Sequence, residues 1–128
     1  MTSTGKLGIQ IALVSSLCGL GCATTRQMSY RDDVQPIIAD KCLGCHTPPY
    51  GEGYRKTGLD MTNYKNLMAG SVYGPVVIPG NSRASPLNML VEGRAGRLTR
   101  ILEDQHKPMT YDETRVLHLW VEQGAMEN

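Results

Sequence analysis

The sequence predicts an all-α fold with long loops, and three observations carry this prediction. Residues 30–41 and 110–121 each place apolar side chains at the three- and four-residue steps of a helix. Helix start signals and glycine stops recur between these two stretches. No βαβ pattern surrounds the cysteine-containing segment that follows residue 41. The 128 residues, 41% of them hydrophobic, are enough for one globular domain and too few for two ordinary ones.

The first predicted helix leads directly into the cysteine-containing segment. Its apolar face consists of residues at helical spacing, namely Tyr30, Val34, Ile37, Ile38 and Lys41. Ser29 stands three residues before Asp32, which is close to the pattern of a capping box. Pro36 fits only the first turn of a helix, so it favours a start near Asp33 or a kink.

The middle of the chain predicts one loop and three short helices, over residues 47–58, 63–69, 86–91 and 94–103. Thr62 is the expected cap of the helix at 63–69, and Gly70 is its expected stop. Ser85 followed by Pro86 is a start signal, because proline is tolerated at the first helical position.

The last predicted helix has the clearest signals in the chain. Thr110 and Glu113 have the spacing of a capping box, and Gly124 supplies the stop. His118 falls on the polar side of this helix and is expected to face solvent. The apolar face is formed by Val116, Leu117, Trp120 and Val121.

Charge and aromatic content limit what the protein does and how it folds. Thirteen Lys and Arg residues against twelve Asp and Glu give a net charge of +1, without the basic excess of a nucleic-acid-binding protein. One Trp, six Tyr and no Phe are few, because large rings normally supply much of the buried area of a small core. The domain must therefore be marginally stable, or complete its core with a large apolar body from elsewhere.

Residues 1–23 have the features of a signal peptide, which leaves 24–128 as the domain. The uncharged run before Cys22 is shorter than the roughly 20 residues that a membrane-spanning helix needs. Gly21 and Ala23 permit ordinary cleavage after Ala23. Alternatively, Leu20-Gly21-Cys22 resembles the lipobox of bacterial lipoproteins, in which the cysteine becomes the lipidated first residue. Either interpretation predicts export to the bacterial periplasm, and the second adds a membrane tether through Cys22.

The remaining two cysteines lie in a C-x-x-C-H motif formed by Cys42, Cys45 and His46. This is the attachment motif of c-type haem. Two thiols one helical turn apart can both reach the vinyl groups along one porphyrin edge. The histidine that follows is then held beneath the iron as the proximal ligand. The motif therefore predicts one covalently bound haem c.

Three other interpretations of the motif were weighed against haem. A thioredoxin-like redox pair is expected within a βαβ pattern, which the sequence lacks. A structural zinc site needs four ligands, and outside the motif only His106 and His118 are available histidines. A disulfide beside an incidental histidine is the third. Haem is favoured because it is attached outside the cytoplasm, where the predicted signal peptide sends the chain.

Three stretches around the motif extend the argument to a family. They are YRDDVQPIIADKCLGCHTP, then TGLDMTNYKNLMAG followed by VVIPGNSRASPLNML, and finally LHLWVEQGA, which together span nearly all of Tyr30 to Ala125. With the motif, they resemble the small single-haem bacterial cytochrome c domains related to class I cytochromes c. The resemblance implies that the N- and C-terminal helices pack around one covalently bound haem. It also implies that a proline carbonyl, of Pro48 or Pro49, accepts a hydrogen bond from His46.

The sixth iron ligand is predicted from the same resemblance. The family's distal methionine lies in the loop before the last helix, where this chain has Met109, and thioether ligation would raise the reduction potential. Relatives place several residues between this methionine and the helix cap, whereas Met109 directly precedes Thr110. His106 is therefore the alternative, with a lower potential, and an open position is another. Three other methionines are expected to fill core space, namely Met61, Met68 and Met89.

The motif and the resemblance together predict a one-electron carrier rather than an enzyme, cycling between Fe(II) and Fe(III) outside the cytoplasm. Its expected partners are redox proteins that donate and accept electrons. Two alternatives remain: a haem enzyme or small-ligand-binding protein with an open sixth site, and a non-catalytic haem subunit of a larger oxidoreductase complex. A porphyrin would also complete the aromatic-poor core, so the haem-free chain is expected to be poorly packed or unfolded.

Overall fold

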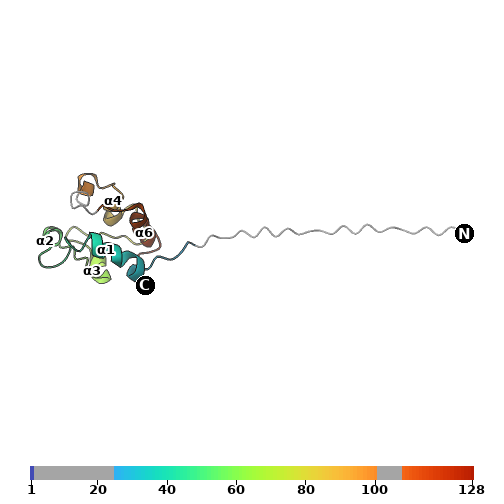
Figure 1. The fold of residues 1–128 in the computed structure, drawn as a ribbon, viewed down its shortest axis with the longest axis horizontal. Coiled ribbons are helices and arrows are strands. Elements are labelled where there is room, and N and C mark those ends of the chain that lie inside the picture. The colour runs from blue at the N-terminus through green and yellow to red at the C-terminus, as the bar shows by residue number, and fades with distance from the viewer. Residues whose placement is uncertain (2–24, 101–107) are drawn as a thin grey trace.

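A computed structural model describes Met1, residues 25–100 and residues 108–128 (Figure 1). Within these residues the chain is helical and forms no β-strand, so the all-α prediction is confirmed. The predicted signal peptide, including Cys22, lies outside the described residues. The elements in chain order are η1 (Tyr30–Val34), α1 (Gln35–Lys41), α2 (Glu52–Thr57), α3 (Tyr64–Ala69), α4 (Pro86–Val91), η2 (Gly96–Thr99) and α6 (Tyr111–Glu122).

The first helix begins at Tyr30, after the candidate cap Ser29, so the alternative start near Asp33 is wrong. Ser29 caps it, because the Ser29 hydroxyl accepts a hydrogen bond from the Asp32 N–H at 3.2 Å. The first turn, η1, is wound as a π-helix, and Pro36 follows in the first turn of α1. The π-helical turn ends at Val34. Pro36 then lies in the first turn of α1, where the missing N–H of proline is tolerated, so the helix continues through it. The predicted inner residues Tyr30, Val34, Ile37 and Ile38 are all buried.

The prediction of a loop over residues 47–58 is wrong at its C-terminal half, where α2 forms. An ion pair of 2.6 Å between Glu52 and Lys56 spans one turn of α2. Gly58 then ends the helix in the left-handed conformation, at φ 68°. Tyr54 connects α2 to the cysteine motif, because its N–H donates to the Cys45 carbonyl at 2.9 Å. Periodicity could not reveal α2, because none of its residues is buried.

The cap of α3 is Asn63, one residue after the predicted cap Thr62. The Asn63 side chain accepts a hydrogen bond from the Asn66 N–H at 2.9 Å. Thr62 instead donates its hydroxyl hydrogen bond to Asp60, at 2.6 Å. The predicted stop at Gly70 is confirmed, since Gly70 has a φ of 81° that other residues adopt only with strain.

The helices predicted to begin at Pro86 and after Thr110 start where expected. α4 begins at Pro86, and α6 follows Thr110 with both halves of the capping box present. The Thr110 N–H donates to Glu113 at 2.8 Å, and the Glu113 N–H donates to the Thr110 hydroxyl at 3.2 Å. In the described part of the helix predicted over 94–103, the 3₁₀ turn η2 forms at 96–99 and Arg100 is α-helical. Residues 101–103 of that prediction lie outside the described residues.

Three of the chain's few aromatic rings gather where η1, α3 and α6 meet. The ring centroids of Tyr30 and Tyr64 are 5.2 Å apart, and those of Tyr30 and Trp120 are 5.7 Å apart. Two of the three side chains also have a hydrogen-bond partner: the Tyr64 hydroxyl donates to the Ala125 carbonyl, and the Trp120 N–H donates to the Met126 carbonyl. The rings therefore join three elements distant in sequence into one core.

The C-terminal residues lie against η1, as Figure 1 shows. The Asn128 carbonyl accepts a hydrogen bond from the Ser29 hydroxyl at 2.8 Å, and its side chain accepts one from the Tyr30 N–H at 3.0 Å. These bonds connect the start and the end of the described domain. The C-terminal residues after α6 are therefore held against the start of the first helix.

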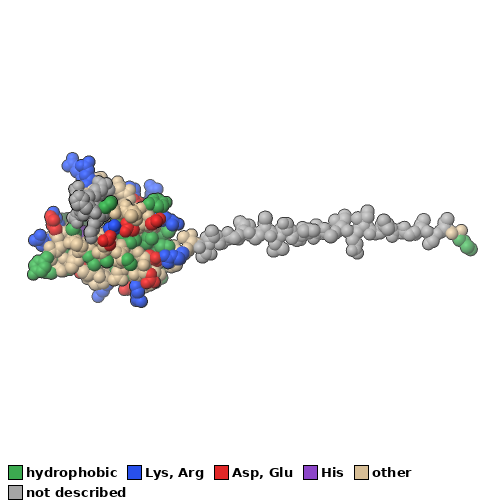
Figure 2. Space-filling view, in the orientation of Figure 1, with side chains coloured by type: hydrophobic (Ala, Val, Ile, Leu, Met, Phe, Trp, Pro, Cys, Tyr) green, Lys and Arg blue, Asp and Glu red, His purple; other side chains and the backbone are tan. Residues whose placement is uncertain are grey.

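The visible surface carries mixed charges. Figure 2 shows Lys and Arg side chains at several separate places, with Asp and Glu side chains among them. This distribution agrees with the net charge of +1. Among the described residues, no helix has both the length and the apolar character needed to cross a membrane.

Candidate functional site

A cavity of about 670 Å³ brings together residues from four stretches of the chain. Its volume falls within the roughly 300–1,000 Å³ typical of ligand sites. The lining comes from the C-terminal end of α1 with the cysteine motif, from residues 57–61 and 71–76, and from α4 through η2. Most of these side chains are apolar. All three residues of the predicted haem motif, Cys42, Cys45 and His46, are among them.

The cysteine motif continues the winding of α1 for one more turn. The Cys42 N–H donates to the Ile38 carbonyl at 2.9 Å, and the His46 N–H donates to the Cys42 carbonyl at 2.9 Å. Residues three and four positions apart share one face of such a turn. This local geometry explains why both thiols and the imidazole reach the same cavity.

The His46 imidazole is held by the backbone of Leu59. Its Nδ1 lies 3.2 Å from the Leu59 carbonyl oxygen. Because a carbonyl oxygen only accepts, Nδ1 must carry the proton, and Nε2 keeps a lone pair for a ligand. Burial lowers the pKa of His46, although the bond to Leu59 works in the opposite direction. Burial thus favours the neutral form of the ring, which is the form that ligates iron.

The predicted hydrogen bond from His46 to a proline carbonyl is wrong. The segment that holds Pro48 and Pro49 turns into α2, with the Gly51 N–H donating to the Thr47 carbonyl at 2.9 Å. The chain then returns past His46, whose carbonyl accepts the Met61 N–H at 3.0 Å. This return places Leu59, rather than either proline, beside the imidazole.

Two glycines that the sequence analysis did not single out allow α2 to approach the motif. A Cβ atom at Gly53 would lie 2.7 Å from Cε1 and 2.8 Å from Nε2 of His46. A Cβ atom at Gly51 would collide with the carbonyl oxygens of Cys45 and Thr47. Both positions therefore need glycine for close approach. The only sequence signal was the glycine content of residues 51–58, which was interpreted as a loop.

The environment of Cys42 is poor for thiolate chemistry. Burial, with a smaller contribution from Cys45, raises the pKa of the Cys42 thiol to about 12. Disulfide-exchange enzymes instead lower the pKa of the attacking thiol, often to below neutral pH. A raised thiol pKa therefore argues against a thioredoxin-like role for Cys42.

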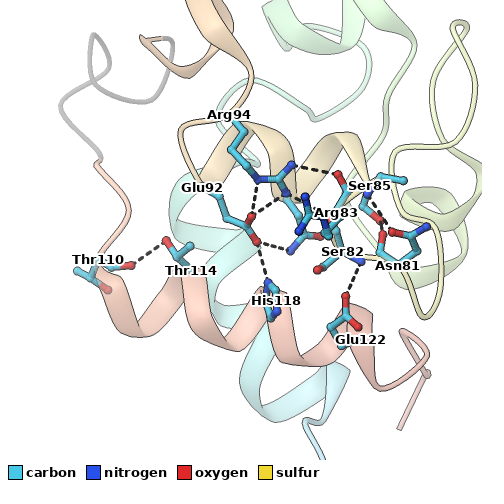
Figure 3. A network of polar contacts seen from close by, with 12 residues as sticks. Asn81, Ser82, Arg83, Ser85, Glu92, Arg94, Thr110, Thr114, His118 and Glu122 are labelled. Carbon is cyan, nitrogen blue, oxygen red and sulfur yellow. Dashed lines mark hydrogen bonds and ion pairs between the residues drawn. The ribbon is translucent and has the colours of Figure 1, made fainter.

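Both charged residues among the described lining are already paired. Lys41, from the end of α1, lies 3.4 Å from Glu113 of α6 and 3.0 Å from Asp40. Arg94 lies 2.7 Å from Glu92, and it also donates to the Ser82 and Arg83 carbonyls (Figure 3). Because both cations are paired with carboxylates, the interior of the cavity remains predominantly apolar.

The sixth-ligand candidates are distributed unevenly around the cavity. Met61 and Met89 line it, whereas Met109 packs against the hydrophobic core and is not among the described lining residues. His106 lies outside the described residues. His118 is only half-exposed, rather than facing solvent as predicted, because its Nδ1 lies 2.9 Å from Glu92.

The described residues contain no cluster of three or more His, Cys, Asp and Glu side chains arranged to hold a metal ion. A haem iron needs no such cluster, since the porphyrin supplies four nitrogens and the protein only axial ligands. The donor set on the cavity wall, two thiols and one neutral imidazole, fits haem c. The apolar lining fits the faces of a porphyrin.

No protein-family model matches this chain, and neither a curated protein nor a solved structure does.

Proposed function

We propose that this protein is a single-haem c-type cytochrome that carries one electron at a time between redox proteins outside the cytoplasm. One observation carries the proposal. Cys42, Cys45 and His46 line an apolar cavity of about 670 Å³, and His46 is held there in the tautomer that leaves Nε2 available. The class I cytochrome c-like arrangement, with terminal helices around one haem, is part of the same proposal.

The chain's own residues would attach and orient the group. Each thiol would add across one vinyl double bond, with sulfur bonding to one carbon and the thiol hydrogen passing to the other. No oxidant or reductant is consumed, but both thiols must first be reduced. His46 Nε2 would be the proximal ligand, while the Leu59 carbonyl fixes the ring through Nδ1.

When bound, haem supplies an iron that changes between Fe(II) and Fe(III). The cavity residues exclude water from it, and low solvent access favours a higher reduction potential. The sequence assigns the sixth position to Met109, with His106 as the alternative, and both remain predictions. Export through residues 1–23 and lipidation of Cys22 belong to the proposal and await the mass of the mature N-terminus.

A haemochrome assay tests covalent attachment directly. The full-length chain is produced in a bacterial host that attaches haem c, then denatured in alkaline pyridine. We expect one haem per chain, retained through acid-acetone extraction and reduced reversibly by one electron. Cys42→Ala and Cys45→Ala should each change the haemochrome spectrum, whereas Gly44→Ala should not, because no atom lies within 4 Å of its added Cβ. Haem that extracts freely would overturn the proposal.

A further inference from the structure

The Leu59 carbonyl that accepts from His46 belongs to the peptide bond between Leu59 and Asp60. Because a peptide unit is planar, the backbone at these two residues decides where the carbonyl oxygen points. The imidazole, 3.2 Å from that oxygen, is therefore held by whatever fixes this peptide. Asp60 itself is neither in the haem motif nor among the described residues that line the cavity.

Both carboxylate oxygens of Asp60 accept hydrogen bonds from residues that follow it. Its Oδ1 accepts two from Thr62, one from the N–H at 2.8 Å and one from the hydroxyl at 2.6 Å. Its Oδ2 accepts a third from the Asn66 side-chain amide at 2.6 Å. Asn66 lies in α3, so the carboxylate connects the segment that holds His46 to a helix. Hydrogen bonds to an ionised acceptor are roughly twice as strong as those between neutral groups.

The hydrogen bonds of Asp60 favour its ionised form. Burial raises the pKa of the Asp60 carboxyl, but hydrogen bonds from Thr62 and Asn66 lower it by more, so the pKa lies below the ordinary 3.8. All three bonds come from donors, and a carboxylate can only accept. An amide in the place of the carboxylate would instead direct its own donor at the Asn66 amide.

The residues on either side of Asp60 are fixed as well. The Leu59 N–H donates to the Thr57 hydroxyl at 3.2 Å, and that hydroxyl donates to the Gly53 carbonyl at 2.7 Å. The Met61 N–H donates to the His46 carbonyl at 3.0 Å. The segment thus contacts His46 at two points, its ring and its backbone, and Asp60 lies between them.

We propose that Asp60 is a positioning residue for the proximal histidine: its carboxylate, bound by Thr62 and Asn66, fixes the Leu59 carbonyl that holds the His46 Nδ1 proton. This inference rests on the proposed function, because it concerns His46 as an iron ligand. A firmly held acceptor strengthens the hydrogen bond from Nδ1, which makes the imidazole a more basic ligand. A more basic ligand stabilises Fe(III), so Asp60 lowers the reduction potential of the haem.

Exchange of the His46 Nδ1 proton with solvent tests this role in the full-length, haem-loaded chain. Nuclear magnetic resonance of the Fe(II) state, with nitrogen-15-labelled histidine, follows this proton. We expect exchange at least about tenfold faster in Asp60→Asn, because two amide donors then face each other. The reduction potential should also rise. Asp112→Asn removes the same charge at an exposed position of α6 and should change neither value.

The swapped variant Asp60→Asn/Asn66→Asp separates positioning from a general loss of stability. It again places one carboxylate opposite one amide, so slow proton exchange and the original potential should both return. Fast exchange in the swapped variant, or unchanged exchange in Asp60→Asn, would overturn the role of Asp60.

If Asp60→Asn fails to load haem, Asn66→Ala decides, because it removes the partner of Oδ2 and leaves both bonds from Thr62. Faster exchange of the His46 proton in Asn66→Ala supports the proposal, and exchange as slow as in the unsubstituted chain overturns it. A normal haemochrome of the unsubstituted chain leaves the proposed function standing in either case, whereas haem that extracts freely from it overturns both.

Discussion

The two sides of α1 differ in how fully their apolar side chains are packed. On the aromatic side, formed by η1, α3 and α6, Tyr30, Tyr64 and Trp120 pack on one another, and Trp120 is fully buried. On the cavity side, formed by the cysteine motif, α4 and η2, Met89 and Leu90 are only half-buried and Leu98 is 59% exposed. The first side is a core made by the chain itself. The second presents its apolar residues to a cavity of ligand size.

This difference shows where in the fold large aromatic rings are lacking. Three of the aromatic residues build the aromatic side, whereas Tyr50, Tyr73 and Tyr111 are each more than 80% exposed. The cavity side contains no comparable cluster among its described residues and relies on aliphatic and methionine side chains. A bound porphyrin would therefore supply the ring that this side lacks.

Removal of the proposed haem should have the largest effect on local stability, and this effect should differ between the two sides. In the double variant Cys42→Ala/Cys45→Ala, we expect amide protection in α4 to fall at least about tenfold more than in α6, because only the cavity side loses packing partners. Hydrogen exchange followed by mass spectrometry measures both helices in one sample. Equal loss on both sides would show that the cavity does not divide the core in this way.

Substitution within the aromatic side should destabilise the whole domain. Trp120→Ala is expected to lower the free energy of unfolding of the haem-loaded chain by about 3–5 kcal/mol, through lost burial and the space left behind. Urea denaturation measures the change. Tyr111→Ala, on the same helix but 81% exposed, is the matched control; it should stay within about 0.5 kcal/mol. Similar values for both variants would contradict the comparison.

A smaller effect is expected where α2 meets the cysteine motif. Gly53→Ala places a Cβ within 2.8 Å of the His46 Nε2, so the ring must move. We expect a loss of about 1–3 kcal/mol and a changed haem spectrum, as for other overpacked sites. Gly44→Ala, inside the motif but with nothing near its Cβ, should leave both unchanged. An unaltered spectrum in Gly53→Ala would mean that α2 does not position His46.

The smallest effect concerns the polar contact that orients α4 against α6. Burial raises the pKa of Glu92, but hydrogen bonds from His118 and Arg94 outweigh it, and the pKa lies below the ordinary 4.5. This stabilisation is therefore present above pH 4.5 and lost as the pH falls through the lowered pKa. Glu92→Gln should lower the free energy of unfolding by about 1 kcal/mol at neutral pH.

The pH dependence of that difference gives a second check. The gap between the unsubstituted chain and Glu92→Gln should narrow below pH 4.5, because the carboxylate becomes protonated. Urea denaturation at several pH values measures it. A gap that widens in acid would show that Glu92 does not stabilise the fold as an anion. Lys56→Ala, which removes an exposed ion pair, is the control and should leave stability nearly unchanged at every pH.

Much of the fold was predictable because its signals are local. The caps at Ser29 and Thr110, the proline start at Pro86 and the stop at Gly70 act within one turn of the chain, so the sequence reveals them directly. The errors arose where contacts between distant residues decide the outcome. α2 buries no residue and is held by its bond to Cys45, which periodicity does not report.

The sequence by itself determined the chemistry of the site, because C-x-x-C-H spacing places two thiols and an imidazole on one helical turn wherever that turn lies. It also determined the all-α class and the packing faces of the first and last helices. Only the tertiary structure decided that Leu59 holds His46 and that Met89 reaches the cavity while Met109 does not. These outcomes depend on how the chain returns past the motif and how α4 is turned against α6. Both are set by contacts between residues far apart in the sequence.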